Sequence, residues 1–310
     1  MMTPTRSLRL FAGTGAMLAM LAWAASAGAA TRPVDEHRPA DATGLVEIQN
    51  VAGRVEVVGW DKAEVAVTGT LGAGVERLDF TSAGSHTTVH VVMHETAGIN
   101  IGWHNGGDAN LVVHVPSGSS LTASLVSADL TVAGIAGNQE VNTVSGDMRL
   151  SAQRDVRIVT VSGDVQLTAG PESRRIDIRT VSGDLTVSGG AGELKVKTVS
   201  GDGSLSLGTL TRAQVNTVSG DFTVGAGLAA DGRFEAESVS GDFRIDFTGG
   251  APPAVYELQS FSGDLSTCFG HKASHEGYGP GSRLNFQEGA GSAHVRVDTK
   301  SGDVTLCSKK

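Results

Sequence analysis

Eight copies of Ser-Gly-Asp recur in this 310-residue sequence and place a carboxylate at regular intervals along the chain. Successive copies lie 17 to 22 residues apart, except for a last gap about twice as long. If each copy occupies the same place in a stacked repeat, the carboxylates form one column that also includes Asp264 and Asp303. Carboxylate oxygens are ligands that Ca²⁺ prefers. The candidate calcium ligands are Asp147, Asp164, Asp184, Asp202, Asp221 and Asp242.

The same carboxylates have a structural interpretation, which we favour. Like charges stacked at the spacing of strands, roughly 5 Å, repel one another and need compensation. Amides of the turn or the neighbouring Ser hydroxyl could supply it, and the Gly-Gly-x-Gly-x-Asp repeat of calcium-binding β-rolls is absent. The threonines that precede the copies are expected to form hydroxyl ladders inside the bend: Thr143, Thr160, Thr180, Thr198 and Thr217.

Five histidines, at positions 86, 90, 94, 104 and 114, are the other candidate metal ligands. On a strand His90 and His94 share one face but lie about 13 Å apart, too far for one ion to bridge. Two facing strands could still bring His90 near His114, which leaves a zinc site open. Solvated histidines on an exposed strand are the favoured interpretation.

The sequence assigns no catalytic residue. It contains no Gly-x-Ser-x-Gly, no His-Glu-x-x-His and no phosphate-binding loop. The enzymatic alternative is a polysaccharide-active enzyme with paired carboxylates on a β-helix. Such a site also needs basic groups to hold an acidic sugar, and here these are scattered: Arg149, Arg157, Arg179 and Lys197.

Cys268 and Cys307 each lie six residues after the Ser of a Ser-Gly-Asp copy, so they occupy the same place in their repeats. If residues 269–290 loop out, the two repeats are neighbours and a disulfide can form. The bond would then fasten the last repeat, where fraying is easiest. The alternative is a degenerate repeat around Leu284 and Phe286 between them, which would leave two separate thiols.

The residues around each copy predict the fold. Apolar residues alternate on both sides of Thr-Val-Ser-Gly-Asp, which is typical of half-buried strands. Ile176 and Ile178 stand at even positions, whereas Val181, Leu185 and Val187 stand at odd ones, so the alternation changes phase across Thr-Val-Ser-Gly-Asp and the chain needs a bend or bulge there. About 19 residues suffice for two short strands and two turns, which predicts an all-β, parallel β-solenoid (β-helix or β-roll-like) whose stacked coils bury one continuous core. An antiparallel sandwich is the alternative, but it does not explain why one tetrapeptide recurs.

Four segments are expected. Residues 1–30 form a signal peptide with Arg6 and Arg9, an apolar run over 10–23 and small residues before the cleavage site; an uncleaved anchor is the alternative. Residues 31–43 form a flexible mature N-terminus, 44–118 an irregular N-terminal β region or cap, and 119–308 the repeat solenoid. Two weaker copies of the repeat stand at 51–54 and 126–129. No transmembrane span remains after cleavage.

The charge narrows the choice of partners. The formal charge is −9 and becomes about −11 without the leader, which argues against nucleic acid and against docking on anionic lipid. Export places the two cysteines in an oxidising compartment. No cofactor is expected apart from the calcium alternative.

The leader, the early Gly-x-Val-x-Val at 53–57, Val-Pro at 115–116 and the serial Thr-Val-Ser-Gly-Asp repeats resemble the bacterial "putative adhesin" family, a domain of unknown function. The resemblance covers residues 44–308. It implies a β-solenoid of the cell envelope with roles in surface attachment or envelope-stress signalling, and it transfers no catalytic residue. We therefore expect a non-enzymatic exported protein, periplasmic, at the cell surface or secreted, that presents a binding or scaffolding face to a glycan, a protein or its own copies. A calcium-stabilised envelope-stress or structural module is a further alternative.

Overall fold

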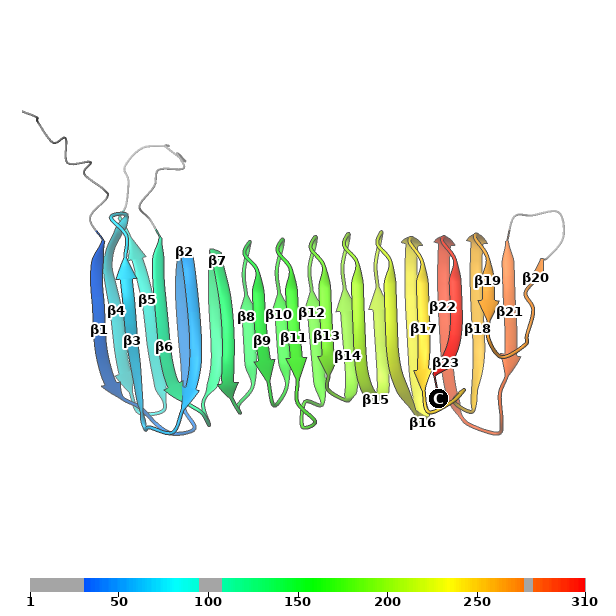
Figure 1. Ribbon diagram of the computed structural model, residues 1–310, viewed down its shortest axis with the longest axis horizontal. Coiled ribbons are helices and arrows are strands. Elements are labelled where there is room, and N and C mark those ends of the chain that lie inside the picture. Colours follow the sequence, from blue (N-terminus) through cyan, green and yellow to red (C-terminus); the bar gives the residue numbers. More distant parts are fainter. Residues whose placement is uncertain (1–30, 95–107, 276–280, 310) are drawn as a thin grey trace, which may run out of the picture.

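The computed structural model describes residues 31–94, 108–275 and 281–309 of the chain. Strands lie side by side across a long stack, and successive coils follow one another along its axis (Figure 1). Each regular coil contributes one strand to each of two ladders, and the two strands of a coil meet at the Ser-Gly-Asp corner. The predicted all-β parallel solenoid is confirmed. No described segment is a helix that could cross a membrane, and the predicted signal peptide at 1–30 lies outside the described residues.

We name the two ladders A and B. Ladder A consists, in spatial order, of β4 (Val75–Ala83), β5 (His86–Met93), the first half of β2 (Leu45–Trp60), the first half of β7 (Ser120–Ile135), β8 (Gln139–Asn142), β10 (Val156–Val159), β12 (Arg175–Arg179), β14 (Gly192–Lys197), the second halves of β15 (Gly203–Asn216) and β16 (Phe222–Ser240), β22 (Ala293–Ser301), β18 (Ala254–Ser262), β21 (Ser282–Gln287) and β20 (Ser274–His275). Ladder B consists of β1 (Arg32–Pro39), β3 (Glu64–Leu71), β6 (Ala109–Pro116), the second halves of β2 and β7, β9 (Met148–Ala152), β11 (Val165–Ala169), β13 (Leu185–Gly189), the first halves of β15 and β16, β17 (Phe243–Thr248), β23 (Val304–Lys309) and β19 (Leu265–Thr267).

The core lies between the two ladders. In the coil that holds β12 and β13, Ile176, Ile178, Leu185 and Val187 are buried against the same positions of neighbouring coils. A single coil could not shelter these side chains, so burial requires stacking. The core column is mostly aliphatic in the middle of the stack and gains Phe222, Phe234, Phe243, Phe247 and Tyr256 toward the C-terminal end.

The change of phase at the corner lies after Thr180. Thr180 continues the inward phase of Ile178 and is buried, whereas Val181 does not share the inward phase of Leu185: it points outward and is 46% exposed. The Thr180 hydroxyl donates to the carbonyl of Ser182, so the polar side chain is satisfied inside the bend. The phase change expected across Thr-Val-Ser-Gly-Asp is therefore confirmed and falls between Thr180 and Leu185, whereas the inward position expected for Val181 is wrong.

The glycine of the corner is required by the backbone and by its neighbours. Gly201 has a φ of +120°, a conformation that side chains with a Cβ rarely adopt. A Cβ at this position would also collide with the carbonyl oxygen of Gly183 in the preceding coil. The repeated Gly therefore permits both the turn and the close stacking of corners.

The N-terminal region differs from the prediction in two places. Residues 32–39, expected to be flexible, form β1, whose backbone pairs antiparallel with β3 along its whole length. Residues 45–60, assigned to the cap, form β2, which pairs parallel with β7 and thus belongs to the stack. The register aligns Ala52, Gly53 and Arg54 with Ser127, Ala128 and Asp129, so the two weak copies occupy equivalent corners. Antiparallel strands β1, β3 and β4 lie beyond this first coil.

The C-terminal end is out of sequence order. The coil of β22 and β23 lies between the coil of β16 and β17 and that of β18 and β19, so the red strands separate yellow from orange in Figure 1. The last repeat in the sequence is therefore not the last in space. The segment around Leu284 and Phe286 does not lie between the cysteine-bearing repeats either. It forms β21, which pairs antiparallel with the far side of β18.

Candidate binding surfaces

The aspartate column is one continuous hydrogen-bonded ladder along the corner. In each coil the backbone N–H of the Asp donates to Oδ1 of the Asp in the coil before it, at 2.7–3.1 Å. The order is Asp129, Asp147, Asp164, Asp184, Asp202, Asp221, Asp242, Asp303 and Asp264. Arg54 forms an ion pair at 3.5 Å with the first member. These contacts support the structural interpretation of the column, because an amide compensates every carboxylate except that of Asp264.

No three His, Cys, Asp or Glu side chains converge as metal ligands anywhere in the described ranges. The calcium role of Asp147 to Asp242 stays a prediction, and a titration can decide it. The histidines are spread out: His86 pairs with Glu47 at 3.3 Å, His90 lies in ladder A, and His114 lies in ladder B. His104 is outside the described residues.

The threonine and serine hydroxyls of the corner form different hydrogen bonds from those expected. Each Thr hydroxyl donates to the Ser carbonyl two residues ahead in its own turn, at 2.9–3.1 Å, instead of bonding to the next Thr. Ser hydroxyls link the coils, because those of Ser145, Ser162, Ser182 and Ser219 donate to the Val carbonyl of the preceding coil at 3.4–3.5 Å. The hydroxyl ladder predicted for the threonines is thus a set of local bonds.

The valine of the motif forms an exposed ridge beside the aspartate column. These side chains are 46–50% exposed in seven consecutive corners: Val126, Val144, Val161, Val181, Val199, Val218 and Val239. Lys300 takes the equivalent place in the coil of β22 and β23, which we call the inserted coil. Phe261, 62% exposed, takes this place in the coil of β18 and β19. Sequence reasoning missed this ridge because Val counts as a core residue in any apolar pattern.

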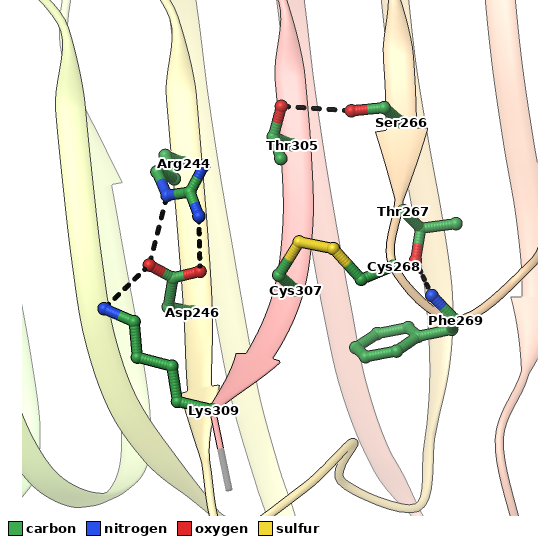
Figure 2. Close-up of a disulfide and its surroundings, with 9 residues drawn as sticks. All are labelled: Arg244, Asp246, Ser266, Thr267, Cys268, Phe269, Thr305, Cys307 and Lys309. Carbon is green, nitrogen blue, oxygen red and sulfur yellow. Dashed lines mark hydrogen bonds and ion pairs between the residues drawn. A yellow bond between two sulfur atoms is a disulfide. The ribbon is translucent and has the colours of Figure 1, made fainter.

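The predicted disulfide is confirmed between Cys268 and Cys307, whose Cα atoms lie 4.9 Å apart (Figure 2). It joins the inserted coil to the coil of β18 and β19. Beside it, Asp246 on β17 is buried under Arg244 at 3.1 Å and Lys309 at 3.2 Å. Burial acts to raise the pKa of Asp246, but hydrogen bonds from Lys309 and Arg244 outweigh it and hold this pKa below its usual range. The ion pair between Asp246 and Lys309 therefore also joins β17 to β23.

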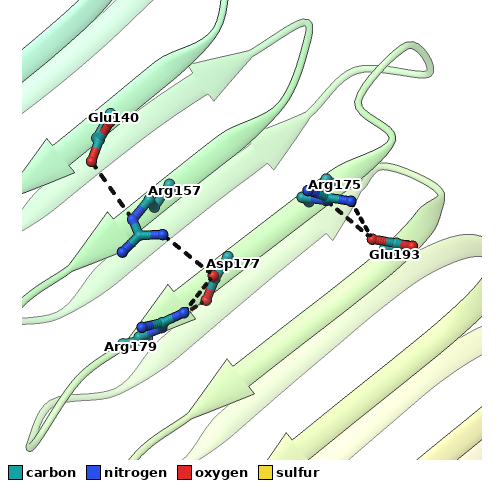
Figure 3. A network of polar contacts seen from close by, with 6 residues as sticks. All are labelled: Glu140, Arg157, Arg175, Asp177, Arg179 and Glu193. Atoms are coloured by element: carbon teal, nitrogen blue, oxygen red, sulfur yellow. Dashed lines mark hydrogen bonds and ion pairs between the residues drawn. The ribbon is translucent and has the colours of Figure 1, made fainter.

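The outer face of ladder A is a network of ion pairs. Arg157 lies between Glu140 at 3.6 Å and Asp177 at 3.9 Å, and Asp177 also contacts Arg179 at 3.0 Å (Figure 3). Glu140, Arg157 and Asp177 border a shallow hollow of about 380 Å³ that is also lined by Leu45 and Thr122. No aromatic side chain lines it. Glu140 and Asp177 are paired with arginines, and Oδ1 of Asp155, the third acid of the lining, accepts hydrogen bonds from the backbone N–H groups of Arg174 and Arg175, so each of its acids is already engaged within the protein.

The outer face of ladder B is uncharged in its middle. On β11, β13 and the first halves of β15 and β16, the outward side chains are Gln166, Thr168, Thr186, Ser188, Ser204, Ser206 and Thr223, and Gly225 completes the set. Arg149 on β9 and Arg244 on β17 bound this region. The two ladders therefore present opposite chemistries on the same coils.

Stacked parallel coils with two ladders and one repeated corner define a β-solenoid repeat protein. The chain belongs to the Toastrack DUF4097 family, whose sequence profile matches residues 46–307. The resemblance drawn from the motifs is thereby confirmed.

Three of the solved structures that match this chain share little sequence with it and have low TM-scores. A "putative adhesin" from Bacteroides fragilis NCTC 9343 is 9% identical, with 89% of this chain and 97% of that chain covered and a TM-score of 0.38. A "putative cell adhesion protein" from Clostridium sporogenes ATCC 15579 is 10% identical, with coverage of 90% and 100% and a TM-score of 0.25. A "putative lipid binding protein" from Parabacteroides distasonis ATCC 8503 is 15% identical, with coverage of 91% and 97% and a TM-score of 0.37. No curated protein matches the chain.

Proposed function

We propose that this protein is a non-enzymatic, exported protein of the cell envelope or surface, adhesin-like, that presents a long rigid face to a partner. The unbroken aspartate ladder carries the proposal. Eight successive links at strand spacing tie the corners together over about 38 Å. A stack tied in this way offers an extended, regular surface, which is how solenoid proteins bind their partners.

The polar groups support a binding role over catalysis. A general acid or base has to be free to exchange a proton with a substrate. In the ladder A hollow, Glu140 and Asp177 are engaged by Arg157 and Arg179. Every corner carboxylate except that of Asp264 accepts a hydrogen bond from a backbone amide. The enzymatic alternative would also call for a groove with aromatic side chains, and this hollow is shallow and has none.

Two observations support export. The sequence begins with a basic and then apolar leader that ends in small residues. Cys268 and Cys307, the two cysteines of the chain, are joined in a disulfide, which is characteristic of oxidising compartments. The periplasm, the outer surface and the medium are all consistent with both features.

A retention assay tests the proposal. The purified exported protein is incubated with separated envelope fractions, namely cell-wall glycan, membrane vesicles and detergent-extracted envelope proteins, and the bound fraction is measured. We expect saturable retention on at least one fraction, and heat-unfolded protein serves as the control for sticking. Retention on none of the fractions would reject a binding role in the envelope.

A further inference from the structure

The middle of ladder B's outer face carries two columns of hydroxyl groups. In the first column Thr186, Ser204 and Thr223 follow one another on β13, β15 and β16. In the second, Thr168, Ser188 and Ser206 follow one another on β11, β13 and β15. Neighbouring strands are about 4.8 Å apart, so the hydroxyls repeat at that interval along the solenoid axis.

Most of these hydroxyls have no hydrogen-bond partner among the residues that the structure describes. Ser188 donates weakly to Thr168 at 3.4 Å. The side chains of Thr186, Ser204, Ser206 and Thr223 are exposed and make no hydrogen bond to any other described residue. Each hydroxyl can donate one hydrogen bond and accept others. The face therefore offers a regular set of open donors and acceptors.

Charge decides which kind of ligand suits this face. The chain has a formal charge of −9, and ladder A on the same coils is covered with ion pairs, yet β11, β13 and the first halves of β15 and β16 present no charged side chain outward. The carboxylates of Asp164, Asp184, Asp202 and Asp221 run along the corner edge of the face. They disfavour an anionic polymer, whereas the face itself holds no carboxylate to pair with a cationic one.

We infer that this face binds a neutral polysaccharide whose chain runs along the solenoid axis. Repeating hydroxylated sugar units complement a repeating set of hydroxyls, and the aspartates at the edge can accept further sugar hydroxyls. The inference rests on the proposed binding function and names the surface and the ligand class for it. Since no outward side chain on the four strands is aromatic, binding depends on many hydrogen bonds and increases with chain length.

The test is co-sedimentation of the purified protein with three insoluble neutral polysaccharides, cellulose, curdlan and mannan, and with calcium alginate gel as the acidic polymer. We expect retention on at least one neutral polymer and none on alginate. Soluble oligosaccharides of two or three units should compete poorly, and longer ones should compete well.

Matched variants locate the site. Ser204→Glu places a carboxylate on ladder B, and Gln214→Glu makes the same change in charge on ladder A of the same strand, β15. We expect Ser204→Glu to weaken binding at least about tenfold, because an unpaired charge opposes a neutral ligand, and Gln214→Glu to leave it within about twofold.

The triple variant Thr168→Val, Thr186→Val and Thr223→Val removes hydroxyls without changing shape, and Thr122→Val on ladder A is its control. Unchanged thermal midpoints establish that all variants are folded.

Each other outcome rejects the inference in a distinct way. Retention on envelope fractions without retention on any neutral polysaccharide rejects the ligand class and leaves the proposed function in place. Loss of binding with Gln214→Glu but not with Ser204→Glu moves the site to ladder A. If Ser204→Glu instead abolishes self-association and no polysaccharide is retained, the face is an interface between copies.

Discussion

The middle of the stack, from β8 to β14, and its C-terminal end, from β16 to β23, are held together differently. In the middle, coils follow sequence order and are joined by core packing, backbone hydrogen bonds, the corner ladder and the ion pairs on the outer face of ladder A. At the end, a coil is inserted out of order, and a disulfide and the buried Asp246 charge cluster appear there. Non-covalent contacts between successive coils thus join the stack where the repeat follows its own order, and a covalent bond and a buried charge accompany the break in that order.

The largest effect should come from a corner glycine in the middle. Gly201→Ala forces a Cβ into a left-handed conformation and against the Gly183 carbonyl, so we expect a loss of about 4 kcal/mol in the free energy of unfolding. Gly249 near the C-terminal end also has a positive φ, +82°, but a Cβ there meets nothing within 4 Å. Gly249→Ala should therefore cost only about 1 kcal/mol. Urea unfolding measures both, and equal losses would mean that close corner stacking does not hold the middle together.

Removal of the disulfide should have the next largest effect and should be confined to the end. The bond closes a loop with a sequence separation of 39 residues, so Cys268→Ala with Cys307→Ala should cost about 3 kcal/mol. Hydrogen exchange should increase in β18, β19, β22 and β23 and remain slow in β10 to β14. Dithiothreitol should reproduce the effect in the wild-type protein and do nothing to the variant. Uniformly faster exchange along the stack would show that the two regions unfold as one unit.

The buried charge should contribute less and should depend on pH. The pKa of Asp246 is lowered in the folded protein, so its ionised form stabilises the fold above the unfolded pKa, and this stability is lost as pH falls through the folded pKa. Asp246→Asn should cost about 1 kcal/mol at pH 7, and the difference from wild type should shrink below about pH 4. Asp298, which is exposed and pairs with Arg296 at 3.6 Å, is the control. A pH-independent difference would assign the effect to packing instead of charge.

The same comparison shows what the sequence can and cannot predict. Coil length, the repeated corner and the pairing of Cys268 with Cys307 follow from the spacing, because identical places in stacked coils become neighbours. The insertion does not follow, because residues 254–265 and 293–304 carry the same inward pattern, with Tyr256 and Leu258 in one and Val295 and Val297 in the other. Either segment could pack on β16. Strand β1 was missed because its polar, proline-flanked sequence gains order only by pairing with β3.

The candidate surfaces were harder to predict for a related reason. Periodicity separates inward from outward positions, and it assigned Val181 inward because it weighs hydrophobicity and not the position of the bend. The Thr180 hydroxyl is buried because it has a local carbonyl partner, a contact that alternation does not encode. The uncharged face of ladder B becomes visible only when the register aligns outward residues that lie 18 to 20 residues apart in the sequence.

The smallest effect should come from removing calcium, and it bears on the corner column that runs through both regions. If Asp147 to Asp242 bound Ca²⁺, the ion would stabilise the native state and EDTA would lower the thermal midpoint. One oxygen of each of these carboxylates already accepts an amide hydrogen bond at 2.7–3.1 Å, so the column is compensated without a cation. We expect the midpoints in EDTA and in millimolar calcium to agree within about 1 °C. A rise with calcium that Asp202→Asn abolishes would instead make the corner a metal-binding column, and the middle of the stack would then need an added link as the C-terminal end does.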